Sequence, residues 1–328
     1  MTTTSVCSPQ MDNDSTYGEE ASNASTSIYS SITRYEWKHN RRYHAYQSGS
    51  YCFPNDDREQ DRLDMLHHAV TRILDDKLFL APINPAGMRI LDIGTGTGLW
   101  SITMGDAYPG ASITGNDLSP IQPDWVPTNV KFIVDDIELD WFQYNRYDYI
   151  HCRYMAASIK NWPRLVRQIY SALKPGGWVE FQEMSSSYYT IAGADEAVPL
   201  AKYHPAHPFL QLSEAMREAC FKTGRMLDPT GHLRRWASEA GFVAVKQLTR
   251  KVPVGKWPLD QPSMEVGALM AVNYVEGVEA MTAVLLRDVL GWPSDEVEML
   301  NVQVRMAAKL NEPKILKDYV VVIAQKGI

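Results

Sequence analysis

The chain has 328 residues, of which 45% are hydrophobic and 10% aromatic, and this is enough apolar side chain for an enzyme-sized core with a lined pocket. Asp and Glu outnumber Lys and Arg by 39 to 32, a balance that argues against a broad positive surface for direct nucleic-acid binding. A membrane span, a secretory leader, a disulfide framework and a metal site are also disfavoured, because the chain shows no apolar run of roughly 20 residues, no basic start before an apolar stretch and no CxxC spacing among its four cysteines.

The N-terminal part of the chain divides into a polar tail and an aromatic segment that leads into a helix. Residues 1–33 are rich in Ser, Thr, Asn and acidic residues, a composition that cannot offset the entropy lost on folding, so we predict a disordered tail. Residues 34–84 begin with aromatic and basic side chains. An added helix is then predicted over residues 57–79, because apolar residues recur there at three- and four-residue spacing.

From residue 85 onward, short β-rich runs alternate with helical stretches, and this alternation predicts a parallel sheet with helices packed on it. The expected strands are Arg89–Ile93, Ser112–Asn116, Lys131–Val134, Tyr147–His151 and Trp178–Gln182. The turn sequence Lys174–Gly177 is expected to end the helix before the fifth strand. We therefore predict an α/β domain over residues 85–328.

The pattern changes in the second half of this domain. After Glu183 the β-rich order loosens, and helices are expected over residues 210–222, 232–240 and up to about 310, with a strand over residues 243–254. The apolar run over residues 319–324 predicts a buried final strand. We interpret residues 185–230 and 257–312 as insertions on the substrate side of the sheet.

The first expected strand runs into a glycine loop, Gly94–Gly98, followed by a helix from Leu99. Such glycines bring bare backbone against a ligand at a helix N-terminus. A nicotinamide site needs G-x-G-x-x-G, but the third glycine position falls on Leu99. A P-loop needs Lys and then Ser or Thr after its last glycine, whereas Leu99 and Trp100 stand there. Both phosphate-binding classes are therefore disfavoured.

The spacing D-x-G-x-G-x-G that starts at Asp92 resembles motif I of class I methyltransferases, which use S-adenosylmethionine. The resemblance implies that Asp92 helps to position the methionine amino group and that Asp136 lies near the adenine, although Asp136 is equally compatible with a helix N-cap. Asp117 ends the second expected strand, where a carboxylate can accept hydrogen bonds from both ribose hydroxyls. The expected cofactor-binding residues are Tyr51, Asp92, Gly94, Thr95, Gly96, Gly98, Asp117, Leu118, Asp136 and Ile137.

Longer stretches of the sequence, from about Arg41 to the C-terminus, are similar to the LaeA-type family of fungal methyltransferases. These stretches are Tyr43-His44, Gly49-Ser50-Tyr51, Glu59-Gln60-Asp61-Arg62-Leu63-Asp64, Asp117–Pro123, Trp162-Pro163 and Leu173–Glu180. The resemblance implies a class I methyltransferase sheet, Rossmann-like and mostly parallel with an antiparallel last strand, with helices on both faces. It also implies S-adenosylmethionine as the cofactor.

The resemblance implies two different functions. Some family members are tailoring enzymes that methylate small fungal secondary metabolites, here at oxygen or nitrogen, whereas others are nuclear regulators of secondary metabolism with velvet-type protein partners. We favour the tailoring enzyme, with a small-molecule acceptor and a cytoplasmic location. The regulator, located in the nucleus, remains the alternative.

Methyl transfer is an in-line displacement at carbon with a neutral thioether leaving, so alignment in a dry pocket matters more than a catalytic triad. A hydroxyl or carboxyl acceptor would still profit from a base, for which the candidates are His151, Glu183 and His207, with His204 close to the last. A structural hydrogen bond is the alternative role for each histidine.

Aromatic faces favour a nearby sulfonium charge, and the candidates for this contact are Tyr43, Tyr46, Tyr51 and Trp100. Ordinary packing is the alternative for each of them. Arg153, just past the fourth expected strand, is a candidate for binding an acidic acceptor or for a surface ion pair.

Overall fold

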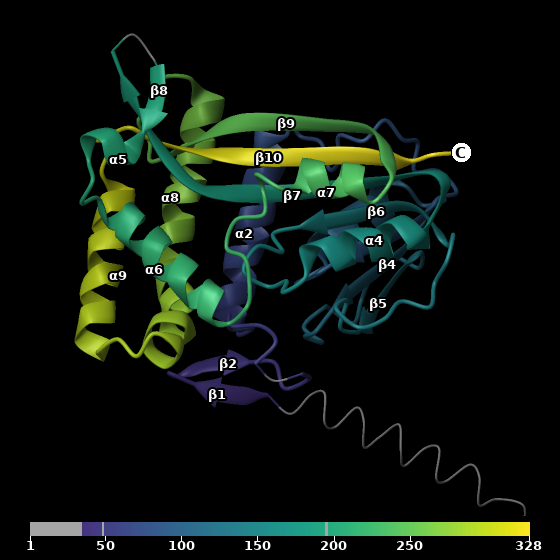
Figure 1. The fold of residues 1–328 in the computed structure, drawn as a ribbon, viewed down its shortest axis with the longest axis horizontal. Coiled ribbons are helices and arrows are strands. Elements are labelled where there is room, and N and C mark those ends of the chain that lie inside the picture. Colours follow the sequence, from purple (N-terminus) through teal and green to yellow (C-terminus); the bar gives the residue numbers. More distant parts are fainter. Residues whose placement is uncertain (1–34, 48, 194–195) are drawn as a thin grey trace, which may run out of the picture.

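The computed structural model describes residues 35–47, 49–193 and 196–328. A mixed sheet lies at its centre, and the longest strands of this sheet run along the long axis of the molecule (Figure 1). Its strands are β3 (Arg89–Ile93), β4 (Ser112–Asp117), β5 (Val130–Val134), β6 (Tyr147–Arg153), β7 (Leu173–Ala192), β8 (Glu196–Pro199), β9 (Phe242–Val254) and β10 (Ile315–Lys326). The order is β5-β4-β3-β6-β7-β10-β9, with β8 on the edge of β7. Strands β3 to β7 are parallel, and β10 is antiparallel to both of its neighbours. The expected class I methyltransferase sheet is confirmed.

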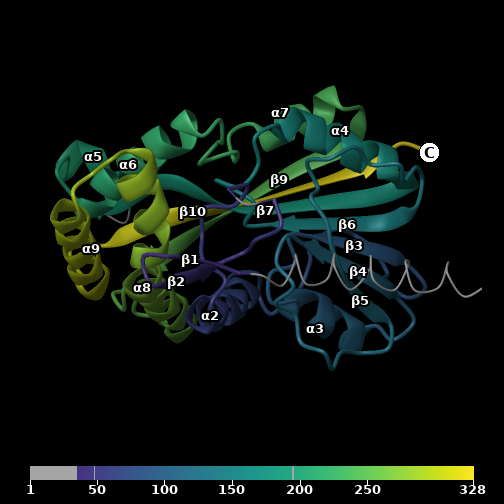
Figure 2. The ribbon, with the colours of Figure 1, turned by 90° about the horizontal axis from the view of Figure 1, so that it is seen from below.

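Helices cover both faces of this sheet (Figure 2). Helices α2 (Asp57–Ile73) and α3 (Leu99–Ala107) pack on one face, and α4 (Trp162–Ala172) and α7 (Leu233–Glu239) on the other. Each face has its own buried cluster, the first containing Trp100 and Leu66 and the second containing Trp162 and Trp236. Because Asp75 and Asp76 take left-handed backbone angles, α2 ends at Ile73 and not at the predicted residue 79.

A group of helices lies at one end of the sheet, on the left in Figure 1. It consists of α5 (Leu200–Tyr203), α6 (Pro208–Lys222), α8 (Gln261–Thr282), the π-helical turn η1 (Ala283–Val289) and α9 (Ser294–Lys309). These helices fall within the two stretches interpreted as insertions. The continuous helix Gln261–Val289 is long and apolar enough to cross a membrane, but it packs against α2, α9 and β9 in the core of the fold.

Strands β7 and β10 extend well beyond the strands predicted for them. The expectation that regular structure loosens after Glu183 is wrong, because β7 continues to Ala192 and pairs with the first half of β10, with Tyr188 opposite Lys317. Three consecutive serines, residues 185–187, hid this strand because serine is not a strand-favouring residue. The extended parts of β7 and β10 therefore lie next to the group of helices at the end of the sheet.

The predicted tail, residues 1–33, lies outside the described residues. The aromatic segment after it forms a hairpin, β1 (Glu36–Lys38) and β2 (Arg41–Tyr43), and then a loop that leads to α2. Arg41 Nη2 donates to Asp56 Oδ1 at 2.8 Å, and Asp56 caps α2 by accepting from the Glu59 N–H. The hairpin is thereby fixed to the start of the helix.

Candidate active site

The glycine loop after β3 lies at the carboxyl ends of the parallel strands, where open α/β sheets bind ligands. Gly96 has φ +58°, and a Cβ atom placed there would meet nothing closer than Leu63 Cδ1 at 3.9 Å. The Gly96 N–H donates to Asp117 Oδ2 at 2.8 Å. The loop is thus bound to the end of β4 and leaves open space beside Gly96.

This open space belongs to a cavity of about 130 Å³, here called the strand-end cavity. The cofactor-binding residues predicted from the sequence that line it are Tyr51, Gly94, Gly96, Asp117, Leu118, Asp136 and Ile137. The ends of β3, β4 and β5 therefore each contribute glycine or acidic residues to the wall of one cavity. Asp117 also accepts from the Ser119 N–H at 2.9 Å, and burial raises its pKa to about 6.

Asp136 lies in this cavity wall and caps a turn, so the alternative of a helix N-cap is wrong. Its Oδ1 accepts from the Glu138 N–H at 2.9 Å, and no helix follows within residues 135–140. Ile137 beside it is buried. An acidic and an apolar side chain thus stand together at the end of β5.

Asp92 at the end of β3 and the loop residues Thr95 and Gly98 lie outside the cavity wall. Asp92 Oδ1 receives a hydrogen bond from His151 Nδ1 at 2.8 Å, and Thr95 and Ser101 hydroxyls donate to Oδ2. Burial alone would raise the pKa of Asp92, but the hydrogen bonds from His151 and Thr95 lower it overall. With all these donors in place, Asp92 holds the loop in shape and does not reach the ligand space itself.

His151 was a candidate base, and the structure places it in this same buried network. Its ring stacks on Trp100 with a centroid distance of 3.9 Å, and only 1% of its surface is exposed. Neither residue lines the strand-end cavity, so the geometry supports the structural alternatives for both. The aromatic candidates Tyr43 and Tyr46 also lie outside the cavity walls, and Tyr43 is buried in the hairpin.

The other two candidate bases, Glu183 and His207, line neither the strand-end cavity nor the second cavity next to it. Glu183 accepts from the N–H groups of Met155 and Ala156, at 2.7 and 3.3 Å, and burial raises its pKa to about 8. It therefore shapes the loop after β6. His207 accepts from the Phe209 N–H at the start of α6, and burial lowers its pKa to about 4. His204 lies in a shallow surface depression near Tyr203.

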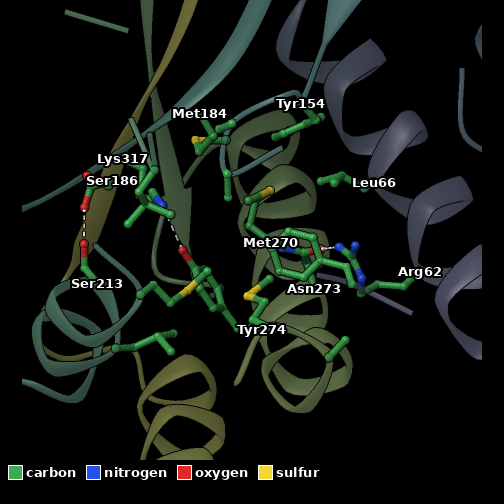
Figure 3. A pocket seen from close by; sticks show the side chains of 18 of the residues that line it. Arg62, Leu66, Tyr154, Met184, Ser186, Ser213, Met270, Asn273, Tyr274 and Lys317 are labelled. Carbon is green, nitrogen blue, oxygen red and sulfur yellow. Dashed lines mark hydrogen bonds between the residues drawn. The ribbon is translucent and has the colours of Figure 1, made fainter. Parts of the chain in front are cut away.

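A second cavity, of about 200 Å³, lies under the helices where β7 and β10 extend beyond the rest of the sheet (Figure 3). We call it the methionine-lined cavity. Its apolar wall contains Leu66, Met184, Leu212, Met216, Leu227, Met270 and Met281. Its polar groups include Arg62, Tyr188, Asn273, Tyr274 and Lys317.

The two cavities adjoin each other, because Tyr51, Leu63 and Tyr154 line both of them. Tyr154 follows β6 directly and has φ +54°, an uncommon backbone angle for a tyrosine. Its hydroxyl oxygen is buried and has no hydrogen-bond partner among the described residues. This border is therefore the place where a ligand in one cavity would face a ligand in the other.

The loop before α2 covers the strand-end cavity with Ser50, Tyr51 and Asn55. Arg225 Nη2 donates to the carbonyl oxygens of Gly49 and Ser50, both at 2.8 Å. Asn55 Nδ2 donates to Ser119 Oγ at 3.2 Å. Both contacts hold Tyr51 at the border between the cavities.

Comparison with known proteins identifies the chain as a methyltransferase, the activity expected from the sequence. Residues 65–247 match the family model described as "Methyltransferase domain". The chain is 52% identical to "Methyltransferase pytC" of Aspergillus terreus, over 97% of this chain and 94% of the relative. The chain belongs to the LaeA-like methyltransferase family. It is also 31% identical to "Secondary metabolism regulator laeA" of Aspergillus fumisynnematus, over 92% of this chain and 80% of that protein.

A further relative is "Protein-methionine methyltransferase laeA" of Emericella nidulans, which is 30% identical over 82% of this chain and 70% of its own length. The names of these relatives thus include both regulators and enzymes. In this LaeA-like methyltransferase, the sequence analysis missed Tyr154, Arg225 and Lys317 as site residues. Only Tyr154 had a usable signal, its position just past the end of a parallel strand.

Arg153 was predicted to bind an acidic acceptor or to form a surface ion pair. It lines the strand-end cavity, and its Nη2 lies 2.9 Å from His67 Nδ1. Burial, together with the charge of Arg153, lowers the pKa of His67 to about 3, so the imidazole is neutral and accepts this hydrogen bond. The guanidinium is thus oriented by a neutral group in the cavity wall, and it forms no ion pair with the described residues.

Proposed function

We propose that this methyltransferase binds S-adenosylmethionine in the strand-end cavity and methylates a small secondary metabolite held in the methionine-lined cavity. The observation that carries the proposal is the shared border of the two cavities at Tyr51, Leu63 and Tyr154. A methyl donor and an acceptor placed on the two sides of this border would meet there. Alignment of this kind is the main contribution that a methyltransferase makes to an in-line displacement.

The residues of the strand-end cavity fit the cofactor group by group. Asp117 offers carboxylate oxygens for the ribose hydroxyls, Asp136 and Ile137 offer an acceptor and an apolar contact for the adenine, and Arg153 offers a cation for the methionine carboxylate. The open space beside Gly96 admits a ligand close to the backbone. When bound, S-adenosylmethionine supplies a methyl group on a sulfonium, whose departure leaves a neutral thioether.

The chain itself orients the reactants and excludes water. Tyr51 and Tyr154 present aromatic side chains at the border, which suits a sulfonium charge. Arg225 and Asn55 hold the covering loop in place. None of the three predicted bases lines either cavity, so an acceptor that is already nucleophilic at neutral pH fits this site best.

Calorimetry with S-adenosylmethionine tests the donor half of the proposal. We expect binding by the native chain and its loss in Asp117→Asn, because the ribose would lose its charged acceptor. Asp124→Asn is the matched control, since Asp124 is exposed and lies outside the cavity. Tight NADH binding with no response to S-adenosylmethionine would overturn the proposal.

The LaeA-like regulator remains the second candidate function, and the similarity to laeA over 92% of the chain favours it. Mass spectrometry of the host separates the two. A tailoring enzyme predicts that the Asp117→Asn strain accumulates a metabolite one methylene lighter. Unchanged structures of all metabolites, with recovery of velvet-type proteins on affinity purification, would support the regulator.

A further inference from the structure

Lys317 is a buried cation in the wall of the methionine-lined cavity. It stands in β10 opposite Tyr188 of β7, and 7% of its surface is exposed. Its Nζ donates to Tyr274 Oη at 3.0 Å (Figure 3). The same Nζ lies 4.4 Å from the centre of the Tyr188 ring. The two tyrosine hydroxyls are 2.7 Å apart. An ammonium and two linked phenols thus form one connected polar group in the cavity wall.

No carboxylate of the described residues forms an ion pair with Lys317, although burying a charge is costly without a partner. The acidic group whose charge acts on it is Asp228. The Asp228 carboxylate is already used by Ser185, the Ser186 N–H and Thr230, at 2.8, 2.6 and 2.5 Å. Tyr274 engages one of the three ammonium donors, and the described residues offer no second acceptor.

Arg62, the other cation in the wall of this cavity, has an anionic partner. Its guanidinium forms two hydrogen bonds with Glu59, at 2.5 and 3.0 Å, and a third with Asn273. Arg62 therefore needs no further anion. Burial lowers the pKa of Lys317 to about 8, which leaves the amine mostly protonated at neutral pH. The cavity thus contains one cation with a matched anion and one without.

We propose that Lys317, with Tyr274 and Tyr188, binds an acidic oxygen of the acceptor substrate, either a carboxylate or an enolate. The acceptor is then an apolar small molecule with one acidic group, whose apolar part lies against the methionines and leucines. Figure 3 shows Lys317 and Tyr154 well apart across the cavity, so the acidic group is an anchor and the methylated atom lies near Tyr154. This inference rests on the proposed function, in which the methionine-lined cavity holds the acceptor.

Binding of decanoate and of decan-1-ol tests the inference, since the two probes share an apolar chain and differ in the acidic group. We expect the native chain to bind decanoate at least about tenfold more tightly, because only its carboxylate offers a charged acceptor to the Lys317 ammonium. Lys317→Met should lose this preference and bind decan-1-ol as before. Lys251→Met is the matched control, because Lys251 lies on the neighbouring β9, 3.3 Å from the Tyr189 ring centre, and pairs with Asp318 outside the cavity.

Equal affinity of the native chain for the two probes, binding of neither probe, or an unchanged preference in Lys317→Met would each overturn the inference. If Lys317→Met does not fold, Tyr274→Phe takes its place, with an expected loss of a few-fold in decanoate affinity only. Calorimetry with S-adenosylmethionine on the same samples reports on the other cavity. Failure there contradicts the proposed function, whereas equal affinity of the native chain for the two probes, with intact cofactor binding, contradicts this inference alone.

Discussion

The two cavities differ in how the chain assembles their walls. The strand-end cavity takes most of its ligand-facing groups from turns that directly follow β3, β4, β5 and β6. The methionine-lined cavity combines α2, the far half of β7, α6, α8 and the start of β10, segments that are distant in the sequence. Local geometry therefore defines the first cavity, whereas the packing of remote elements defines the second.

This difference suits a methyltransferase. A donor cavity built from strand ends keeps its form when insertions change, because the strand, turn and helix fix it locally. An acceptor cavity built from insertions can change its lining without disturbing that unit. The chain would thus combine a general cofactor site with a specific acceptor site. The predictions below test whether the two cavities are as separable as this comparison implies.

The largest expected effect is that of Gly96→Arg on the strand-end cavity. The new side chain would occupy the open space beside residue 96 and adopt a left-handed φ, so cofactor affinity should fall by roughly 100-fold or more, about 2.7 kcal/mol. Decanoate binding in the other cavity should persist. Calorimetry with both ligands measures the two effects, and Gly231→Arg is the control because nothing lies within 4 Å of its Cβ position. Loss of decanoate binding as well would show that the cavities are not separable.

Glu183→Gln tests the loop that both cavities share. In the folded chain the pKa of Glu183 is about 8, above its ordinary value of 4.5, so the folded state keeps a proton that the unfolded state releases. The free energy of unfolding contributed by this group is therefore full below pH 4.5 and falls as the pH rises to 8. The native chain should lose a few kcal/mol relative to Glu183→Gln over that window. Urea unfolding of both chains at several pH values measures this, and parallel pH profiles would contradict it.

Arg225→Met should have a smaller effect that reaches both cavities. The substitution removes both hydrogen bonds to the Gly49 and Ser50 carbonyls, so Tyr51 would be held less firmly at the border. We expect cofactor affinity to fall about tenfold, because charged hydrogen bonds are worth roughly 1.5–3 kcal/mol. Calorimetry measures the loss against Arg217→Met, whose arginine is exposed and pairs with Glu214 among the described residues. Equal affinities in the two variants would show that the covering loop keeps its position without the hydrogen bonds from Arg225.

Sequence reasoning found the glycine and acidic residues of the strand-end cavity because their signals are local. Gly96 and Asp117 follow strands that the hydrophobic pattern reveals, and parallel strands bring their carboxyl ends to one edge. The direction of a side chain within a strand is a different matter. His151 lies opposite Asp92 in the register of β6 and β3, which puts it in the buried network behind the loop. That register is not readable from the sequence, so the burial of His151 behind the loop could not be predicted.

The methionine-lined cavity was missed for a related reason. Its polar group depends on the pairing of Lys317 with Tyr188 across two strands whose extended parts the sequence did not reveal. It also depends on Tyr274 from a long helix that packs over them. No local pattern connects these three residues, since only the tertiary fold brings them together.

Tyr154→Phe is expected to give the smallest effect, and it tests the border itself. The Tyr154 hydroxyl is buried without a partner among the described residues, and an unmet polar group of this kind costs stability. Removing it should leave the melting temperature unchanged or higher. If the acceptor uses this hydroxyl, the host strain should make roughly fivefold less methylated product, which corresponds to one hydrogen bond of about 1 kcal/mol.

The matched control is Tyr144→Phe, because Tyr144 is 70% exposed and lies outside both cavities. A lower melting temperature in Tyr154→Phe would mean that the hydroxyl has a partner within the protein, so its role would be structural. Unchanged product with unchanged stability would mean that the Tyr154 ring, and not its hydroxyl, contributes to the border. A loss of product at full stability is the one result that ties this hydroxyl to the acceptor, because the described part of the chain offers the hydroxyl no other partner to lose.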